Sequence, residues 1–257
     1  MNVQLEMKLD DLLATGAVVA IKSELEAEGA RFEELSKLTI LLSSRRVPLA
    51  IKIGGCEAIT DLRIAKDLNA RFVIAPMIES VFALSKYKNS IRKIYTVDEV
   101  NDVNFAFNLE TKTAYSIFDE LSAFAGGEIQ GVVFGRTDYT QSLSLPNSEI
   151  DGESVTAALI NSSKISLREN LEFTIGGSLT VRSLETLRKI KQIHLSRFET
   201  RKVVLDATHL DSPHVERTIE KALAFELAWL LTKRESAINM TLEDQSRISK
   251  LENLLIE

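Results

Sequence analysis

The chain has 257 residues, of which 45% are hydrophobic and 26% charged, and its formal net charge is −6. This balance is typical of a globular protein with one large domain or two small ones. No run of about 20 apolar residues occurs, which argues against a membrane protein, and lysine and arginine are too scattered to predict nucleic-acid binding. A single cysteine, Cys56, excludes an intrachain disulfide and a multi-thiolate metal site. Because the N-terminus also resembles no targeting segment, we expect a cytoplasmic protein.

Short β-branched or aromatic runs alternate with amphipathic segments along most of the chain. Strands are predicted over residues 17–24, 48–54, 72–77, 103–109, 131–135 and 171–176, with a weaker stretch within 193–205. Helices are predicted between them, over residues 30–44, 59–68, 80–94, 111–124, 154–169 and 181–191. Such alternation is typical of a parallel sheet covered by helices. An eighth strand would come either from the N-terminal segment or from a division of residues 193–205, and the pattern leaves this open.

The pattern changes after Asp206. Two further helices are predicted, over residues 214–237 and 242–256, without a strand between them. We therefore expect a single α/β barrel domain over residues 1–257, with residues 207–257 as a C-terminal helical extension. Phe225 and Trp229 lie four residues apart and share a helix face, which would pack on the barrel or on a neighbouring subunit. The extension is consistent with a homo-oligomer.

Charged and small residues follow nearly every predicted strand. Because ligands of parallel α/β folds bind at the carboxyl ends of the strands, we expect these residues to meet at one rim. A charge is costly to bury unless it is paired or bound to a metal, so several of them converging there predict a polar pocket. Any single one could instead be a solvated residue at a strand–loop junction. The residues concerned include Lys22, Glu24, Lys52, Glu79, Glu110, Gly135, Arg136, Asp138 and Gly177, and the weak seventh stretch adds Arg197, Glu199 and Arg201.

Two carboxylates stand out among these residues, because Glu110 and Asp138 end consecutive predicted strands. Oxygen ligands of this kind suit Mg²⁺ or Mn²⁺, which could hold a 2-oxo acid through its carboxylate and keto oxygens. The alternative is that the pair has only a structural role. Zinc is less favoured, since all three histidines occur late in the chain without the spacing of a zinc motif.

At these residues the sequence resembles a known family. Residues 108–143, NLETKTAYSIFDELSAFAGGEIQGVVFGRTDYTQSL, are similar to the segment of the HpcH/HpaI aldolase–citrate lyase family in which an ET strand end is followed by a helix and a strand ending in G-x-x-D. The separation of the two acids, 138 − 110 = 28 residues, suits that unit. Residues 50–54 (AIKIG) and 75–80 (APMIES) also resemble the family, and the resemblance extends over about residues 17–177.

The resemblance implies a (β/α)8 TIM barrel, a divalent metal and reversible carbon–carbon cleavage of 2-oxo acid aldols or acyl-CoA adducts. It also implies oligomers that exchange C-terminal helices. Glu110 and Asp138 would be the metal ligands. Lys52 stands where the family usually has an arginine that steadies the substrate, and Glu24 where the family has its first-strand acid. The residue after that acid, often a catalytic histidine, is Leu25, and Arg136 replaces the usual proline.

From these observations we expect a metal-dependent lyase acting on a pyruvate-type 2-oxo acid, with Lys52 and Glu24 as catalytic residues. The substrate would be bound by Lys22, Glu79, Gly135, Arg136 and Gly177. The lysines could hold an extra phosphate or carboxylate, form an imine, or simply pair with a glutamate. Two other functions stay open: an acyl-CoA lyase or synthase like citrate lyase, and a catalytically reduced barrel that binds a 2-oxo acid, which the loss of the histidine at Leu25 suggests.

Overall fold

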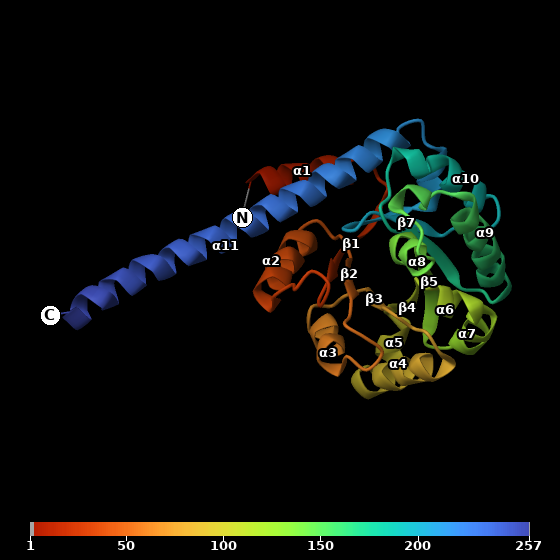
Figure 1. Ribbon diagram of the computed structural model, residues 1–257, viewed down its shortest axis with the longest axis horizontal. Coiled ribbons are helices and arrows are strands. Elements are labelled where there is room, and N and C mark those ends of the chain that lie inside the picture. Colours follow the sequence, from red (N-terminus) through yellow and green to blue (C-terminus); the bar gives the residue numbers. More distant parts are fainter. Residues whose placement is uncertain (1–2, 257) are drawn as a thin grey trace.

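Eight strands close into a barrel in chain order, and helices surround it (Figure 1). The computed structural model describes residues 3–256. The strands are β1 (Val18–Glu24), β2 (Leu49–Lys52), β3 (Phe72–Ala75), β4 (Asn104–Leu109), β5 (Ile129–Gly135), β6 (Glu172–Gly176), β7 (Arg197–Glu199) and β8 (Val203–Asp206). The predicted barrel is thereby confirmed, and the seventh and eighth strands both come from the division of residues 193–205.

The α-helices follow the strands in alternation as far as β7. They are α1 (Val3–Leu13), α2 (Phe32–Ser43), α3 (Ile59–Asp67), α4 (Val81–Ile94), α5 (Val97–Asn101), α6 (Lys112–Ser116), α7 (Phe118–Ala125), α8 (Arg136–Ser142), α9 (Glu153–Arg168), α10 (Leu184–Lys191) and α11 (Val215–Ile256). Short 3-10 helices span Asn147–Glu149, Val181–Ser183 and Ala207–Asp211. The N-terminal segment is therefore a helix.

Strand β8 differs from the other seven because it runs antiparallel to both of its neighbours, β7 and β1. Only Thr200, Arg201 and Lys202 separate β7 from β8. A crossover between parallel strands needs about a dozen residues, so a three-residue connection can only turn back as a hairpin. The sheet is consequently parallel from β1 to β7, and the β7–β8 hairpin lies at the carboxyl ends of those seven strands.

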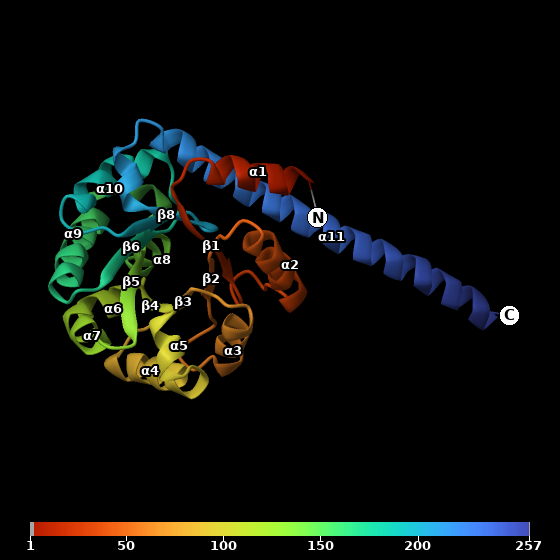
Figure 2. The ribbon, with the colours of Figure 1, turned by 180° about the vertical axis from the view of Figure 1, so that it is seen from behind.

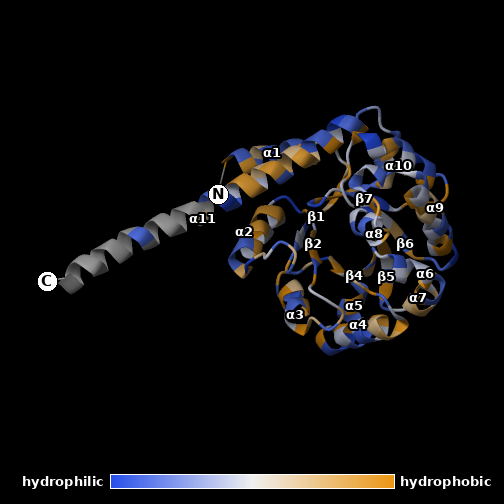
Figure 3. Cartoon of the chain, viewed as in Figure 1, coloured by the Kyte–Doolittle hydropathy of each residue, from blue (hydrophilic) through white to orange (hydrophobic). Residues whose placement is uncertain are grey.

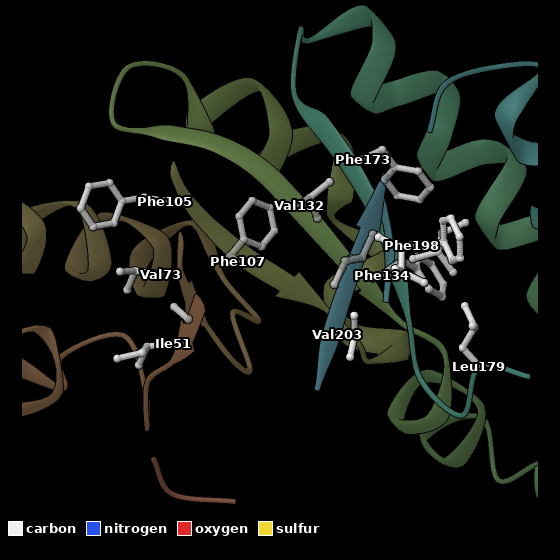
Figure 4. Packing of buried hydrophobic residues seen from close by; sticks show 14 of the residues in the cluster. Ile51, Val73, Phe105, Phe107, Val132, Phe134, Phe173, Leu179, Phe198 and Val203 are labelled. Atoms are coloured by element: carbon white, nitrogen blue, oxygen red, sulfur yellow. The ribbon is translucent and has the colours of Figure 1, made fainter. Parts of the chain in front are cut away.

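Strand residues alternate between the helices and the barrel interior. Large side chains such as Phe105, Phe107, Phe134 and Phe173 point outwards into the main core, where the helices cover them (Figure 4). The interior holds a smaller apolar layer: Ala20, Ala50, Ile74, Ala106, Val133 and Val204. Polar groups occupy the two ends of the interior. At the amino end, Arg197 forms a bidentate ion pair with Glu172, and the carboxyl end carries the candidate site.

The C-terminal segment forms one continuous helix, α11, and not the two predicted helices. No glycine or proline interrupts residues 215–256, so nothing in the backbone ends the helix near residue 240. Helix α11 runs beside α1 and continues beyond it, as the opposite views of Figures 1 and 2 show. Hydrophobic residues occur on the part of α11 beside α1 (Figure 3). Within residues 3–256, no helix is long and apolar enough to cross a membrane.

Candidate active site

A cavity of about 440 Å³ opens at the carboxyl ends of the seven parallel strands. Its volume falls within the range of small-molecule sites. Seven of the nine residues predicted to form the site line it: Lys22, Glu24, Lys52, Glu110, Gly135, Asp138 and Gly177. Alternation of side chains between the helices and the barrel interior explains this convergence. Lys22, Lys52 and Glu110 occupy inward-facing positions of their strands, like the small residues of the apolar layer below them.

Glu110 is the most deeply buried of the acidic residues that line the cavity, with 2% of its surface exposed. Its Oε1 accepts a hydrogen bond from the Met77 backbone N–H (2.9 Å), and its Oε2 accepts one from Asn108 Nδ2 (2.7 Å). Both bonds fix the direction of the carboxylate. Gly135 leaves room for it, because a Cβ at Gly135 would lie 2.9 Å from the Glu110 Cβ. The position of Glu110 is thus set by three neighbouring segments of the chain.

Electrostatics at Glu110 favour a nearby cation. Burial raises the pKa of Glu110 above its usual value, and the charge of Asp138, in the first turn of α8, adds to this effect. Lys52 and the two hydrogen bonds oppose it. The Lys52 ammonium is 3.9 Å from Glu110 Oε2, which is too far for a hydrogen bond. A buried carboxylate beside a second carboxylate, with no hydrogen-bonded cation, is a favourable place for a metal ion.

The donor set fits a hard divalent cation. The described residues contain no group of three or more histidine, cysteine, aspartate or glutamate side chains that could hold a metal. Glu110 and Asp138, which both line the cavity, are the two carboxylates that the sequence predicts as ligands. Mg²⁺ is commonly bound through one or two carboxylates, with water and substrate oxygens completing its octahedron. These two residues are compatible with that pattern and not with a closed structural zinc site.

Alternating charges cross the cavity floor from β7 to β4. The Lys22 ammonium donates a hydrogen bond to Glu199 and lies 4.0 Å from Glu24. Glu24 in turn lies 3.8 Å from the Lys52 ammonium. Burial alone would lower the pKa of Lys22, but Glu199 and Glu24 together outweigh burial and raise it. Lys22 is accordingly a charged partner of Glu199, which disfavours the imine alternative, since imine formation needs a neutral amine.

Arg136 does not bind in the cavity as predicted, and this prediction is corrected. The side chain is fully buried and does not line the cavity, and its guanidinium donates to the carbonyl oxygens of Gly176 (3.1 Å) and Gly177 (2.7 Å) and pairs with Asp151. Arg136 instead holds the turn after β6 against the start of α8. Gly177 lies in that turn at φ +89°, and a Cβ there would be 2.6 Å from the Thr137 backbone nitrogen.

Glu79 also lies outside the cavity. Its carboxylate accepts a hydrogen bond from Thr111 Oγ1 (2.6 Å) on the exposed surface beside the mouth. Among the lining residues that sequence reasoning did not place in the site are Leu223 and Glu226 of α11. Burial raises the pKa of Glu226. Only the docking of α11 brings Glu226 there, and no local motif marks it.

The histidines of the described chain take no part in the site. A ring nitrogen of His194 lies 2.8 Å from the Leu171 carbonyl oxygen, and one of His209 lies 2.8 Å from Thr218 Oγ1. Neither residue lines the cavity. Leu25, at the position of the family's histidine, packs against the main core. Among the side chains that line this cavity, the candidates for acid–base work are therefore the carboxylates and the lysines.

The closed barrel and the position of its cavity define a TIM-barrel protein. No family model matches the sequence, and no curated protein matches it either. Solved structures with a similar fold include HpcH/HpaI aldolase and citrate lyase family proteins. An HpcH/HpaI aldolase from Desulfitobacterium hafniense gives a TM-score of 0.62 at 11% identity, covering 78% of this chain and 83% of that one.

Two further structures agree. A family protein from Burkholderia cenocepacia gives a TM-score of 0.60 at 12% identity, covering 93% of this chain and 91% of that one. A citrate synthase variant gives 0.58 at 12% identity, covering 90% of each chain. At these identities the likeness is one of fold. It confirms, at that level, the resemblance noted in the sequence.

Proposed function

We propose that the protein is a carbon–carbon lyase that depends on a divalent metal and acts on a 2-oxo acid. The observation that carries this proposal is the placing of Glu110 and Asp138 together at the mouth of the barrel, with the Lys52 ammonium 3.9 Å from Glu110. Mg²⁺ or Mn²⁺ bound by the two carboxylates would polarise the keto and carboxylate oxygens of the substrate.

The chain's own side chains supply the remaining roles for cleavage of a 4-hydroxy-2-oxo acid. Glu24 takes the proton of the 4-hydroxyl group, the C3–C4 bond breaks, and its electron pair moves toward the C2 carbonyl as an aldehyde leaves. The Lys52 ammonium, between Glu24 and Glu110, offsets the charge that develops on the C2 oxygen. Return of the proton from Glu24 to C3 gives the 2-oxo acid.

Proton exchange at the methyl group of pyruvate tests this function. Wild-type protein with Mg²⁺ or Mn²⁺ in deuterated water should exchange these protons, as followed by NMR. Glu110→Ala should slow exchange by about 100-fold or more, the usual scale for losing a group that stabilises developing charge. Glu79→Ala is the matched control, because it removes a carboxylate outside the cavity. Exchange that survives both metal removal and Glu110→Ala would contradict the metal assignment.

Other outcomes of the same assay point to the two alternatives. If no 2-oxo acid exchanges but turnover appears with a CoA thioester, the protein is an acyl-CoA lyase or synthase. If neither substrate class reacts while a 2-oxo acid still binds, the barrel is catalytically reduced. The replacement of the histidine by Leu25 is the feature that supports this last alternative.

A second copy of this chain is the proposed macromolecular partner. A groove of about 640 Å³ lies between α1 and α11 and is lined by Met7, Leu227 and Leu231. These side chains are exposed, as is Leu230 of α11. Contiguous exposed apolar patches of this kind mark sites of association with a partner. Burial of this face between two copies would remove it from water.

A further inference from the structure

Glu24, the acid–base residue of the proposed function, has a carboxylate that no described residue holds by a hydrogen bond. The cations of Lys22, Lys52 and Arg201 lie 4.0, 3.8 and 3.9 Å from it. These distances are too long for hydrogen bonds, so the charges do not fix the direction of the carboxylate. A catalytic group has to be held within about 0.5 Å of its productive position. The backbone at Glu24 is therefore what sets the position of the side chain.

The backbone of β1 loses its strand partner on one side just before Glu24. On the side of β2, the Leu25 N–H donates to the Lys52 carbonyl oxygen (3.0 Å), so the ladder continues there. On the side of β8, the Lys22 N–H donates to the Lys202 carbonyl oxygen (2.7 Å). The chain turns away into the β7–β8 hairpin at that point. The next N–H on this side belongs to Glu24, which is buried, and a buried N–H needs an acceptor.

Glu28, in the turn that follows β1, supplies this acceptor. Its Oε2 accepts hydrogen bonds from the Glu24 N–H (3.4 Å) and from Ser23 Oγ (3.3 Å). The side chain of Glu28 is 12% exposed and does not line the cavity. Glu28 thus takes the place of a neighbouring strand at the end of β1, and it contacts Glu24 through the backbone.

Three cations from other parts of the chain hold Glu28 in place. The Lys202 ammonium pairs with Oε2, and Arg201 Nε lies 3.4 Å from Oε1. Lys233 of α11 donates to the Glu28 carbonyl oxygen (3.0 Å). Lys202 is itself buried, so its ion pair with Glu28 is costly to break. Glu28 therefore joins the end of β1 to the hairpin and to α11.

We infer that Glu28 is a positioning residue, whose carboxylate sets the direction in which Glu24 projects into the cavity. This inference rests on the proposed function, in which Glu24 transfers the proton. Glu28 itself neither touches the substrate nor moves a proton, and it acts by accepting the Glu24 N–H. The acid–base group is consequently aligned by the hairpin and α11, the two parts of the fold that depart from a regular parallel barrel.

Amide hydrogen exchange at Glu24, followed by NMR, tests the contact without any substrate. Glu28→Ala removes the acceptor and should speed exchange of this amide by about 10-fold, the scale for losing one hydrogen bond. Glu28→Gln keeps an acceptor oxygen and should retain most of the protection. Both variants remove the charge that pairs with Lys202, so a difference between them reports the hydrogen bond and not the lost ion pair.

Proton exchange at the methyl group of pyruvate, measured with Mg²⁺ over a range of pyruvate concentrations, shows whether the contact serves proton transfer. Glu28→Ala should lower the rate at saturating pyruvate by about 10- to 100-fold, because a displacement near 1 Å can cost that much. The half-saturating concentration should stay constant, since Glu28 lies outside the cavity lining. Glu28→Gln should recover most of the lost rate.

A double variant separates positioning from a general loss of structure. Glu28→Ala added to Glu24→Gln should cause no further loss of rate, because a residue that acts through Glu24 has no effect once Glu24 is disabled. Glu34→Ala is the matched control: Glu34 also pairs with Lys233 (3.2 Å), but it lies on α2. It should keep the wild-type rate and the protection at Glu24. If unpaired Lys202 prevents folding, the alanine and glutamine variants are compared in a chain that also carries Lys202→Met.

The inference is overturned if Glu28→Ala and Glu28→Gln show the same protection at Glu24 or the same rate at saturating pyruvate. It is also overturned if Glu28→Ala slows exchange as much in the Glu24→Gln background as in wild type. In these cases, metal-dependent exchange by the wild-type protein leaves the proposed function standing. Absence of exchange in the wild type, or wild-type exchange in Glu24→Gln, removes the proposed role of Glu24 and the inference with it.

Discussion

Lys22 and Glu199 form a buried ion pair across β8, the strand that separates the two strands carrying them. A Cβ at Gly176 would lie 2.9 Å from Glu199 Oε1, so Glu199 has little room to rearrange. The pair closes the cavity floor on the side of the barrel where β8 runs antiparallel. Its integrity governs both the charge of the floor and the stability of that side of the barrel.

Removing the lysine alone should be costly. Lys22→Met leaves the Glu199 carboxylate buried without its partner, and the free energy of unfolding should fall by about 3–5 kcal/mol. The double variant Lys22→Met/Glu199→Gln should recover more than half of this loss, because no unpaired charge remains. Lys86→Met, which breaks an exposed pair with Glu57, should cost about 0–1 kcal/mol. Denaturant unfolding measures all three, and equal losses in Lys22→Met and Lys86→Met would contradict the buried pair.

The turn after β6 should tolerate no side chain at Gly177. Gly177→Ala combines a left-handed backbone with a contact of 2.6 Å to the Thr137 nitrogen, so we expect a loss of at least about 1–3 kcal/mol. Gly55→Ala is the control, since nothing lies within 4 Å of a Cβ at Gly55. Thermal unfolding compares the two. A Gly177→Ala protein as stable as Gly55→Ala would show that Arg136 does not hold this turn rigidly.

Lowering the pH should reduce the free energy of unfolding through His209, which lies between β8 and α11. Burial lowers the pKa of His209 below its usual value, His214 adds to this, and Asp206 opposes it. In the window between the lowered pKa and the usual value near 6.5, the unfolded chain binds more protons, so stability rises with pH and is lost on acidification. His209→Gln should flatten the dependence of the unfolding free energy on pH just below about 6.5. An unchanged slope would mean that His209 makes no contribution.

The proposed association of two copies should depend on the apolar face beside α1. Leu227→Lys places a charge on that face and should shift the protein toward the monomer in sedimentation velocity. Leu167→Lys on α9 is the control, since Leu167 is similarly exposed (54% against 58% for Leu227) but lies on another face. If Leu227→Lys sediments like wild type and both are oligomers, the interface lies elsewhere. A monomeric wild type would remove the proposal.

Patterns that depend on neighbouring residues predicted much of the fold and the site. The strands up to β6 followed from short apolar runs, and the presence of Glu110 and Asp138 in the lining of one cavity followed from their positions after consecutive parallel strands. The antiparallel direction of β8 was not predicted, although the three residues that separate it from β7 are too few for a crossover. The continuity of α11 was not predicted either, although residues 215–256 contain neither glycine nor proline.

Features that depend on distant partners could not be predicted in this way. Arg136 follows a strand as an exposed arginine would, and its burial is decided by Asp151 and by the carbonyl groups of Gly176 and Gly177. Glu226 is one of many charged residues on α11, and only the angle at which that helix docks brings it to the cavity. Sequence spacing carries no information on either contact.

The reversal of β8 also affects how this barrel can vary. At most positions around such a barrel, loops of any length can be inserted after a strand to reshape the mouth. Here one sector of the mouth is a three-residue turn whose first and last side chains are buried, so insertions there would dislodge Thr200 or Lys202. Change in this sector is therefore confined to substitutions of one residue, Arg201, whose exposed side chain lines the cavity, so the lining of the mouth can vary there while the barrel stays intact.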